Sequence, residues 1–447
     1  MENGKLKTGS MLRQFLLSDA GLMLLLWLLV VAERLLFTQW DRLSLSFIVS
    51  DSPDYYQSGL DFARTGRLIF RGVPSAMIMP GISVLIGLLS FVFPDGPALL
   101  YAIRFVWILM GSLVPLFLYR SLRLFVPRAW AGLGAAVYLM PWHVQIDCFL
   151  LTECPYYLFF AMALYYTLKM GEDSRIRYAW LYAVSVLLAL LFRANILIFV
   201  VFSFAWLLLR RRYSLPELGK RALILALVLG LFIVPWTIRN ARLYRAFIPV
   251  TYGAGNPMYE GTYQGENPPS DEEILALDDG FSAYAAVAEK RPDLLDAEGH
   301  VYDPDTQQYV DLLVARELGL YRLRTWWRLR PLGLLKSYLL VKPRTILNWV
   351  WYYVELGGIS FAMAHRMRQL GFLFCALSVL LSLLLKKHRR LILFLSAAYF
   401  INLYLLSTSY AIDRYAQMIM PYRYLIMGLG LDLLAALLRR RRAPSRF

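Results

Sequence analysis

Long apolar blocks separated by short polar segments run through most of this chain. A helix needs about 20 mainly apolar residues to cross the ~30 Å of hydrocarbon in a bilayer, and ten of the blocks approach or reach that length. They are 20–38, 98–118, 129–147, 150–168, 176–193, 194–209, 221–238, 370–385, 391–408 and 415–438. The pattern therefore predicts an all-α polytopic membrane protein with about ten or more transmembrane helices. The first block lacks a small-residue cleavage site, so we expect it to be retained as an anchor.

Two further apolar stretches, 76–93 and 346–363, are ambiguous by length, so charge has to place them. Lys and Arg concentrate in the cytoplasmic loops of membrane proteins. The basic clusters of this chain are Arg210–Arg212, Lys386–Arg390 and Arg439–Arg442. They share the cytoplasmic side with both termini only if neither ambiguous stretch crosses fully. We therefore expect 76–93 to be half-inserted or parallel to the surface, as its early Pro80-Gly81 pair also favours.

Two long segments between the spans are then expected on the outer side of the membrane, and they divide the chain into three parts. Residues 1–240 form an N-terminal transmembrane module whose first outer loop is 39–97. Residues 241–345 form a small extracytoplasmic cap with an acidic middle. Residues 346–447 form C-terminal transmembrane helices with a basic cytoplasmic tail.

Composition agrees with membrane residence and excludes several other classes. Apolar residues make up 59% of the chain and charged residues 17%, below the roughly 25% of soluble domains. The net charge of +16 does not indicate nucleic-acid binding, because spans separate the basic clusters and prevent one continuous phosphate track. The 3 cysteines form no CxxC pair and there are only 4 histidines, so a soft-metal site is not expected.

Polar and ionisable residues gather at the outer ends of the predicted spans. Charges at membrane depth cost several kcal/mol unless they are paired or solvated, so such residues are candidates for a functional site. They are Asp51, Asp54, Tyr55, His143, Asp147, Glu153, Arg193, Arg239, Asn240 and Arg414. A purely structural role competes with function, since Asp51 and Asp54 precede a predicted amphipathic helix over 55–63 and a helix cap contributes about 1 kcal/mol. Single arginines can also be ordinary interface anchors.

The mixture of acids and arginines suits one kind of chemistry in particular. A lipid-phosphate leaving group needs Arg or Lys to neutralise its developing charge. An acceptor hydroxyl needs a carboxylate to take its proton. A site at the membrane boundary lets a polyprenyl tail remain in lipid while its phosphate and sugar reach water.

Four short motifs occur in an order that resembles a known family. They are Asp-Ser-x-x-Tyr at 51–55, Thr-Glu at 152–153, Phe-Arg at 192–193 and Pro-Trp-x-x-Arg-Asn at 235–240. This order resembles the polytopic GT-C glycosyltransferases, most closely the glycosyltransferase 39-like branch related to protein O-mannosyltransferases and aminoarabinose transferases. The resemblance implies a GT-C fold with surface-parallel helices in the first outer loop. It also implies sugar transfer from a polyprenyl-phosphate donor on the extracytoplasmic face of the cell membrane.

The resemblance assigns roles to the candidate residues. The expected catalytic residues are Asp51 as base, Asp54 as the alternative base, and Glu153. The arginines expected to bind the donor phosphate are Arg193, Arg239 and Arg414. The residues expected to orient the substrates are Tyr55, His143, Asp147 and Asn240. Met79-Pro80-Gly81 stands where aminoarabinose transferases have Lys-Pro-Pro, and the missing lysine argues against that particular activity.

No cofactor is expected, although Asp51, Asp54 and Glu153 together are a possible divalent-metal site. The expected partners are a polyprenyl-phosphate sugar, membrane lipids, and an acceptor that is a protein, a glycolipid or a cell-wall glycan. Two alternatives remain: a lipid-linked glycan polymerase or ligase, and a lipid or solute transporter. The chain shows no internal repeat of the transporter kind, and a ligase is not expected to place an acidic motif directly after its first span.

Overall fold

The computed structural model describes residues 18–37, 51–277, 280–296, 298–348 and 350–442. Residues 39–50 of the predicted first outer loop lie outside these ranges. Within them, 6 helices are long and apolar enough to cross a membrane, or up to 7 if one bent helix pair counts as a span. The predicted helical membrane-protein class is therefore confirmed, and the total of about ten crossings stays a prediction.

The long helices correspond to predicted spans and expose apolar side chains outward. They are α2 (Asp19–Phe37), α6 (Pro97–Arg123), α12 (Leu215–Tyr244), α19 (Phe361–Leu385), α20 (Arg389–Ser407) and α22 (Met420–Arg442). On α12, Leu223, Leu227 and Leu231 are each more than half exposed and recur every four residues. Such a stripe is stable only against an apolar solvent, which identifies it as a lipid-facing surface.

The predicted span 129–147 is wrong as a single helix. It is broken into α7 (Arg128–Ala136), the 3-10 turn η1 (Val137–Leu139) and α8 (Pro141–Cys148). The break has a local cause, since Met140 is extended with ψ of 136° and Pro141 cannot donate a backbone hydrogen bond. The following helix α9 (Glu153–Glu172) is bent by 112° from α8.

Two further predicted spans are present as short helices. They are α10 (Arg177–Phe192) and α11 (Ile196–Arg210), of 16 and 15 residues. At 1.5 Å per residue each covers about 23 Å, less than the full hydrocarbon thickness. The residues between them, including Arg193, are consequently held close to the membrane boundary.

Neither ambiguous stretch forms a spanning helix. Within 76–93 the helix α5 (Gly81–Ser90) has 10 residues, about 15 Å or half of a hydrocarbon core. Within 346–363, α18 (Lys342–Asn348) ends at Asn348 and α19 begins only at Phe361. Both observations agree with the topology expected from charge.

The described part of the first outer loop contains two helices, the second of them α5, and a hairpin between them. The helix α4 (Ser52–Thr65) includes the predicted amphipathic stretch and packs against α5. The strands β1 (Ile69–Phe70) and β2 (Val73–Pro74) are antiparallel, with Phe70 opposite Val73. Arg71 and Gly72 form the two-residue turn between them, and both have positive φ, 56° and 84°. This geometry matches the twist of a tight hairpin and points the Arg71 side chain outward from the turn.

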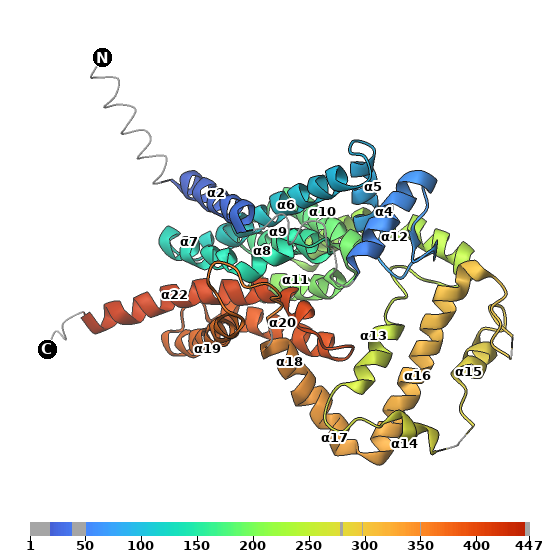
Figure 1. Ribbon diagram of the computed structural model, residues 1–447. Helices are drawn as coiled ribbons and strands as arrows, with labels where there is room; N and C mark the ends of the chain where they lie inside the picture. Colours follow the sequence, from blue (N-terminus) through green and yellow to red (C-terminus); the bar gives the residue numbers. More distant parts are fainter. Residues whose placement is uncertain (1–17, 38–50, 278–279, 297, 349, 443–447) are drawn as a thin grey trace.

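The segment after α12 folds into a separate lobe at one end of the membrane helices (Figure 1). Its elements are α13 (Gly255–Glu260), η2 (Gly261–Tyr263), α14 (Asp271–Leu275), α15 (Ala283–Lys290), η3 (Pro304–Thr306), α16 (Gln307–Leu329), α17 (Pro331–Lys336), the π-helical η4 (Ser337–Val341) and α18. Val287, Leu295, Tyr309 and Val310 are buried in a core that the lobe shares with α12 and the first outer loop, including Tyr244 and Leu68. The expected cap therefore exists as a folded unit, while the exact domain boundaries stay predictions.

Two of the three basic clusters lie together at another part of the molecule. Arg210, Lys386, Arg389 and Arg390 line one cavity where α11 ends and α20 begins. In Figure 1 the C-terminal end of α22 and the N-terminal end of α2 point away from the cap. The helices thus have a basic end and a cap end, which is the separation that the positive-inside rule requires.

Candidate active site

Asp51 stands at the N-terminal end of α4 but does not cap it with its side chain. Its backbone carbonyl accepts the amide of Tyr55 at 2.9 Å, as in an ordinary first turn. Its carboxylate instead accepts a hydrogen bond from Arg414 Nη2, which lies 3.1 Å from Oδ2. The capping alternative for Asp51 is therefore not realised, and the side chain remains available to a site.

Glu153 begins α9, and its side chain is buried, only 2% exposed. Its Oε1 forms ion pairs with Arg193 Nη1 at 2.7 Å and with Arg414 Nε at 3.0 Å. Arg193 Nη1 also donates to the hydroxyl of Thr152 at 3.0 Å. Arg193 follows the C-terminal end of α10, and Arg414 lies in the short helix α21 (Asp413–Gln417). Three charged residues from separate helices therefore lie in contact: Glu153, Arg193 and Arg414.

Arg71, which is not among the residues predicted for the site, extends this set toward solvent. Its Nε donates to Asp54 Oδ2 at 2.6 Å, and its Nη2 lies 3.6 Å from Asp51 Oδ1. Asp54 is therefore occupied by Arg71 and makes no cap for α4 either. A basic residue beside glycine between two short β-prone runs was the only available signal, and it is a weak one.

Together these residues form a continuous chain of alternating charges, which we call the ion-pair chain: Asp54, Arg71, Asp51, Arg414, Glu153 and Arg193. From Arg71 to Glu153 the exposed fraction of the side chain falls, from 47% for Arg71 to 25% for Asp51, 11% for Arg414 and 2% for Glu153. The outer end can therefore meet water-borne groups, while the inner end is fixed in protein. Three acids and three arginines balance, so the chain carries no net charge until a substrate enters.

Local electrostatics fix the protonation states in the middle of this chain. Burial by itself lowers the pKa of the Arg414 guanidinium, but the charges of Glu153 and Asp51 raise it above its ordinary value. Arg414 is consequently a permanent cation. One turn after Asp51, burial raises the pKa of the Tyr55 phenol, and the Asp51 carboxylate raises it further. Tyr55 thus lines the site as a neutral phenol, with its ring centred 5.8 Å from that of Phe70.

Asp147 and His143 do not join the ion-pair chain in the described contacts. Arg34 Nε donates to Asp147 Oδ2 at 3.0 Å, and the hydroxyl of Tyr138 donates to Oδ1 at 3.0 Å. His143 Nε2 lies 2.5 Å from the Tyr424 hydroxyl. Asp147 and His143 are completely buried, so their expected substrate-orienting role has no support in this placement. They hold α2, α8 and α22 together instead.

Glycine at position 111 makes the buried Asp147 possible. A Cβ on Gly111 would lie 2.1 Å from Cγ of Asp147, so any larger residue on α6 would displace the carboxylate. A buried acid without its cation is strongly destabilising, which explains why Arg34 from α2 completes the arrangement.

Arg239 and Asn240 brace the outer loop instead of joining Arg193 and Arg414. Arg239 Nη1 donates to the carbonyl of Ser75 and to Asn240 Oδ1, each at 2.8 Å. Asn240 is fully buried and donates to the carbonyl of Ile248 at 2.8 Å. The structure therefore separates the three arginines expected at the donor phosphate: two are in the ion-pair chain, and Arg239 supports the segment after the hairpin.

The cap reaches the ion-pair chain from two sides. Gln308 of α16 donates to the carbonyl of Phe70, the residue before Arg71, at 3.2 Å. Gln264 donates to the carbonyl of Ala411 at 3.0 Å and accepts its amide at 2.7 Å. Ala411 lies three positions before Arg414. The cap therefore holds the two backbone segments that carry Arg71 and Arg414, the arginines next to Asp51.

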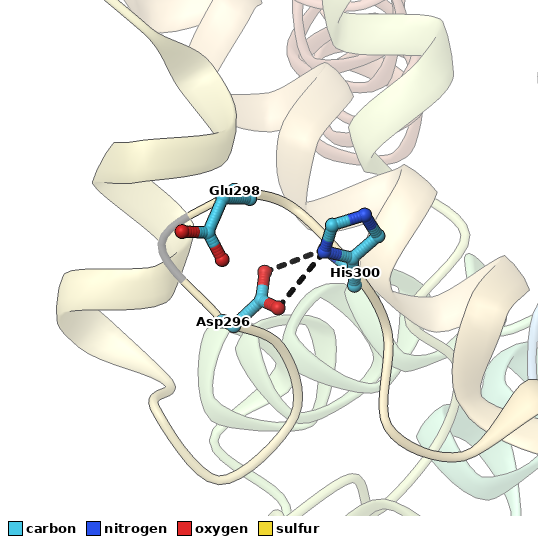
Figure 2. Close-up of side chains that lie close together, drawn as sticks. All are labelled: Asp296, Glu298 and His300. Atoms are coloured by element: carbon cyan, nitrogen blue, oxygen red, sulfur yellow. Dashed lines mark hydrogen bonds and ion pairs between the residues drawn. The ribbon is translucent and has the colours of Figure 1, made fainter.

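The acids of the ion-pair chain are not arranged as a metal site. Arg71 and Arg414 lie between Asp51, Asp54 and Glu153, and these carboxylates do not converge. Among the residues that the structure describes, the one set of three such ligands lies elsewhere, in the cap. Figure 2 shows this set on its loop, with the His300 ring turned toward Asp296. The expectation of a metal-independent enzyme stays a prediction.

Comparisons with known proteins address the fold and the N-terminal module. Residues 80–238 match the family model described as dolichyl-phosphate-mannose-protein mannosyltransferase. No curated protein sequence matches the chain.

Solved structures provide the second comparison. The oligosaccharyltransferase AglB of Archaeoglobus fulgidus, in complex with an inhibitory peptide and a dolichol-phosphate, is 16% identical with a TM-score of 0.56, and the match covers 95% of this chain and 51% of AglB. Its apo form gives 15% identity, the same coverage and a TM-score of 0.55. ArnT of Cupriavidus metallidurans bound to undecaprenyl phosphate is 14% identical with a TM-score of 0.40, over 94% of this chain and 77% of ArnT.

This chain spans about half the length of AglB, and at such low identity the likeness concerns the fold alone. The match of 80–238 includes Glu153 and Arg193 but neither Asp51 nor Arg414. The family resemblance seen in the sequence is nonetheless confirmed: the chain has the fold of the GT-C glycosyltransferases, and its residues 80–238 match their dolichyl-phosphate-mannose-protein mannosyltransferase family.

Proposed function

We propose that this protein is a membrane glycosyltransferase that moves a sugar from a polyprenyl-phosphate donor to an acceptor hydroxyl at the extracytoplasmic face. One observation carries the proposal: Arg414 joins the acid of the first outer loop, Asp51, to the buried Glu153–Arg193 pair. A potential base and two potential phosphate ligands therefore lie within one connected group, at the end of the helices that the cap covers.

Asp51 is the base in this mechanism. Its carboxylate takes the proton of the acceptor hydroxyl while the acceptor oxygen forms a bond to the anomeric carbon of the donor sugar. Asp51 is preferred over Asp54 because it is linked to Arg414, whereas the described partner of Asp54 is Arg71 at the exposed end. At Asp51 a proton acceptor and a proposed phosphate ligand are therefore adjacent.

Arg414 and Arg193 bind the leaving phosphate. When the bond between the anomeric carbon and the phosphate oxygen breaks, its electron pair stays on the phosphate and adds one negative charge. Guanidinium groups that already lie in place stabilise such charge without reorganisation, and they bind phosphate oxygens in bidentate fashion. Glu153 holds both arginines in position and is not in contact with the reacting atoms.

Donor binding also prepares the base. In the free protein Arg414 Nη2 is hydrogen-bonded to Oδ2 of Asp51, so this carboxylate oxygen is not open to an acceptor hydroxyl. A donor phosphate that attracts Arg414 releases the Asp51 carboxylate, so the base becomes effective only when the sugar donor is present. This order limits unproductive proton transfer and favours donor binding before acceptor binding.

The test is sugar transfer in proteoliposomes that receive a labelled polyprenyl-phosphate sugar and candidate acceptors from outside. Asp51→Asn is expected to lower the transfer rate by about 10²–10⁴-fold while insertion and thermal unfolding are unchanged. Asp61→Asn on the same helix is the matched control, because Asp61 contacts only Gln57 among the described side-chain partners. Full transfer by Asp51→Asn would contradict the assignment of the base. Movement of the label across the membrane without a covalent product would favour the transporter alternative.

A further inference from the structure

A cavity of about 340 Å³ lies between η1 and α8 on one side and α19 and α22 on the other. Its apolar lining includes Met140, Trp142, Met367, Phe374, Met420 and Met427. This volume falls within the range of small-molecule sites, and flexible Met side chains adapt to chains of varied shape. No member of the ion-pair chain lines it, so it is distinct from the candidate active site.

Two buried arginines line the same cavity, and within the described part of the chain no carboxylate pairs with either. Arg368 and Arg423 are 4% and 2% exposed. Arg368 donates to the backbone carbonyls of Leu347 and Ile346, each at 3.0 Å, and Arg423 Nη2 donates to the carbonyl of Arg368 at 2.9 Å. Among the described residues neither forms an ion pair, and Arg423 Nε has no hydrogen-bond partner. Burying two neighbouring cations without an anion is costly, so we expect an anionic ligand to bind beside them.

The cavity lies beside an exposed apolar face of α19. Leu370 lines it and is also 64% exposed on the outer face of α19. Leu373 and Leu377 on the same helix are exposed as well, which marks this face as lipid-facing. An occupant that enters here comes from the bilayer and needs an alkyl chain for the apolar lining. It also needs a negative group for the guanidiniums.

We propose that this cavity binds an anionic phospholipid of the surrounding membrane. The phosphate meets Arg423 and Arg368, and an acyl chain fills the space beside Met427 and Phe374. Gly371 provides part of that space, since a Cβ there would make only ordinary contacts, 3.5 Å to Arg423 and 3.8 Å to Met427. A longer side chain at this position would therefore enter the cavity without displacing the backbone.

The proposal is tested by native mass spectrometry of the full-length protein released from nanodiscs that contain equal amounts of phosphatidylglycerol and phosphatidylcholine. We expect the wild type to retain one phosphatidylglycerol selectively. Arg423→Gln is expected to lower that retention about tenfold or more, and Arg423→Lys to restore most of it, because a charged hydrogen-bond donor is lost and regained. Gly371→Leu is expected to abolish retention of both lipids.

Two controls separate binding from general damage. Gly230→Leu places the same side chain on the spanning helix α12, where a Cβ meets nothing within 4 Å. Arg344→Gln removes an exposed arginine from α18. Both are expected to retain phosphatidylglycerol as the wild type does. Equal retention of the two lipids by the wild type, or undiminished retention by Arg423→Gln, would overturn the proposal. Recovery of a polyprenyl phosphate in place of the phospholipid would also overturn it and assign the cavity to the donor.

Discussion

Arg414 donates a hydrogen bond from Nη2 to Oδ2 of Asp51 at 3.1 Å, although 363 positions separate the two residues. The contact joins the first outer loop to the segment before the last helix, α22. It places the proposed base beside a proposed ligand of the leaving phosphate. The strength of this one ion pair therefore influences both halves of the proposed reaction.

Replacement of Arg414 is expected to slow the chemical step more than it weakens substrate binding. Arg414→Gln removes a cation that faces developing charge, so we expect kcat to fall by about 10²–10³-fold. Arg414→Lys is expected to recover only part of the rate, because one ammonium cannot serve Asp51 and Glu153 as a planar guanidinium does. Steady-state transfer kinetics with a varied donor concentration measure the effect, and Arg344→Gln is the control. An unchanged kcat with a raised KM would contradict a role at the leaving group.

Replacement of Glu153 is expected to affect stability as well as rate. Glu153→Gln leaves Arg193 and Arg414 close together without their shared acid, and breaking a buried pair in this way costs about 3–5 kcal/mol. Thermal unfolding in detergent is expected to show a clear loss for this variant and none for Asp51→Asn.

A double variant tests whether the lost stability of Glu153→Gln comes from repulsion between Arg193 and Arg414 or from lost packing. Glu153→Gln combined with Arg193→Gln removes one of the two adjacent cations, so we expect it to be more stable than Glu153→Gln alone. If the two losses simply add, the arginines are not held together by Glu153.

The cap is expected to control the rate through the position of Arg414. Gln264→Ala removes both hydrogen bonds to Ala411, each worth about 1 kcal/mol, and frees the backbone three residues before Arg414. We expect a several-fold lower kcat in the wild-type background and little further loss in Arg414→Gln. Gln307→Ala is the matched control, since Gln307 is exposed and bonds only to Asp311 among the described side-chain partners. An equal loss in both backgrounds would show that Gln264 acts elsewhere.

Lys342 makes the stability of the cap junction depend on pH. Its ammonium is buried, donates to the carbonyl of Gly261 at 3.0 Å, and lies 4.0 Å from the ring centre of Tyr338. Burial lowers the pKa of Lys342 to about 8 from 10.5. Between these two values the unfolded chain binds a proton that the folded protein does not, so stability rises with pH across the window.

The comparison of wild type with Lys342→Met isolates this effect. We expect the variant to be more stable relative to wild type below pH 8, where the buried lysine is charged, and its advantage to shrink as pH rises toward 10.5. Thermal unfolding at a series of pH values measures the difference in stability between the two proteins. The contributions of the other titrating groups cancel in this difference. A difference that does not change with pH would show that Lys342 is not buried as a titrating group.

Much of the architecture was predictable because its signals are local in sequence. The length of an apolar block relates directly to bilayer thickness, so the long helices and the short α5 follow from hydropathy and charge alone. The helix break at Pro141 could also have been predicted from the proline itself. It was missed because the apolar residues around it satisfied the hydropathy criterion, and hydropathy does not detect a missing backbone donor.

The site was predictable in its residues but not in its connections. Asp51, Glu153, Arg193 and Arg414 do come together, as expected from their common membrane boundary. Asp147 and Arg239 satisfy the same criterion, yet one is neutralised inside the bundle and the other braces a loop. Residue type and expected position at a span end are the same in the two groups, so neither property distinguishes them.

The sequence by itself therefore determined that this is a helical membrane protein that resembles the GT-C glycosyltransferases, and it supplied the candidate charged residues. Only the tertiary structure decided which charges meet. An ion pair weakens within a few ångströms of separation, and that separation is set by how the helix ends pack and bend, not by spacing along the chain. Arg71 was not predicted for the same reason. Its contacts with Asp51 and Asp54 depend on a two-residue hairpin turn that places its side chain beside them.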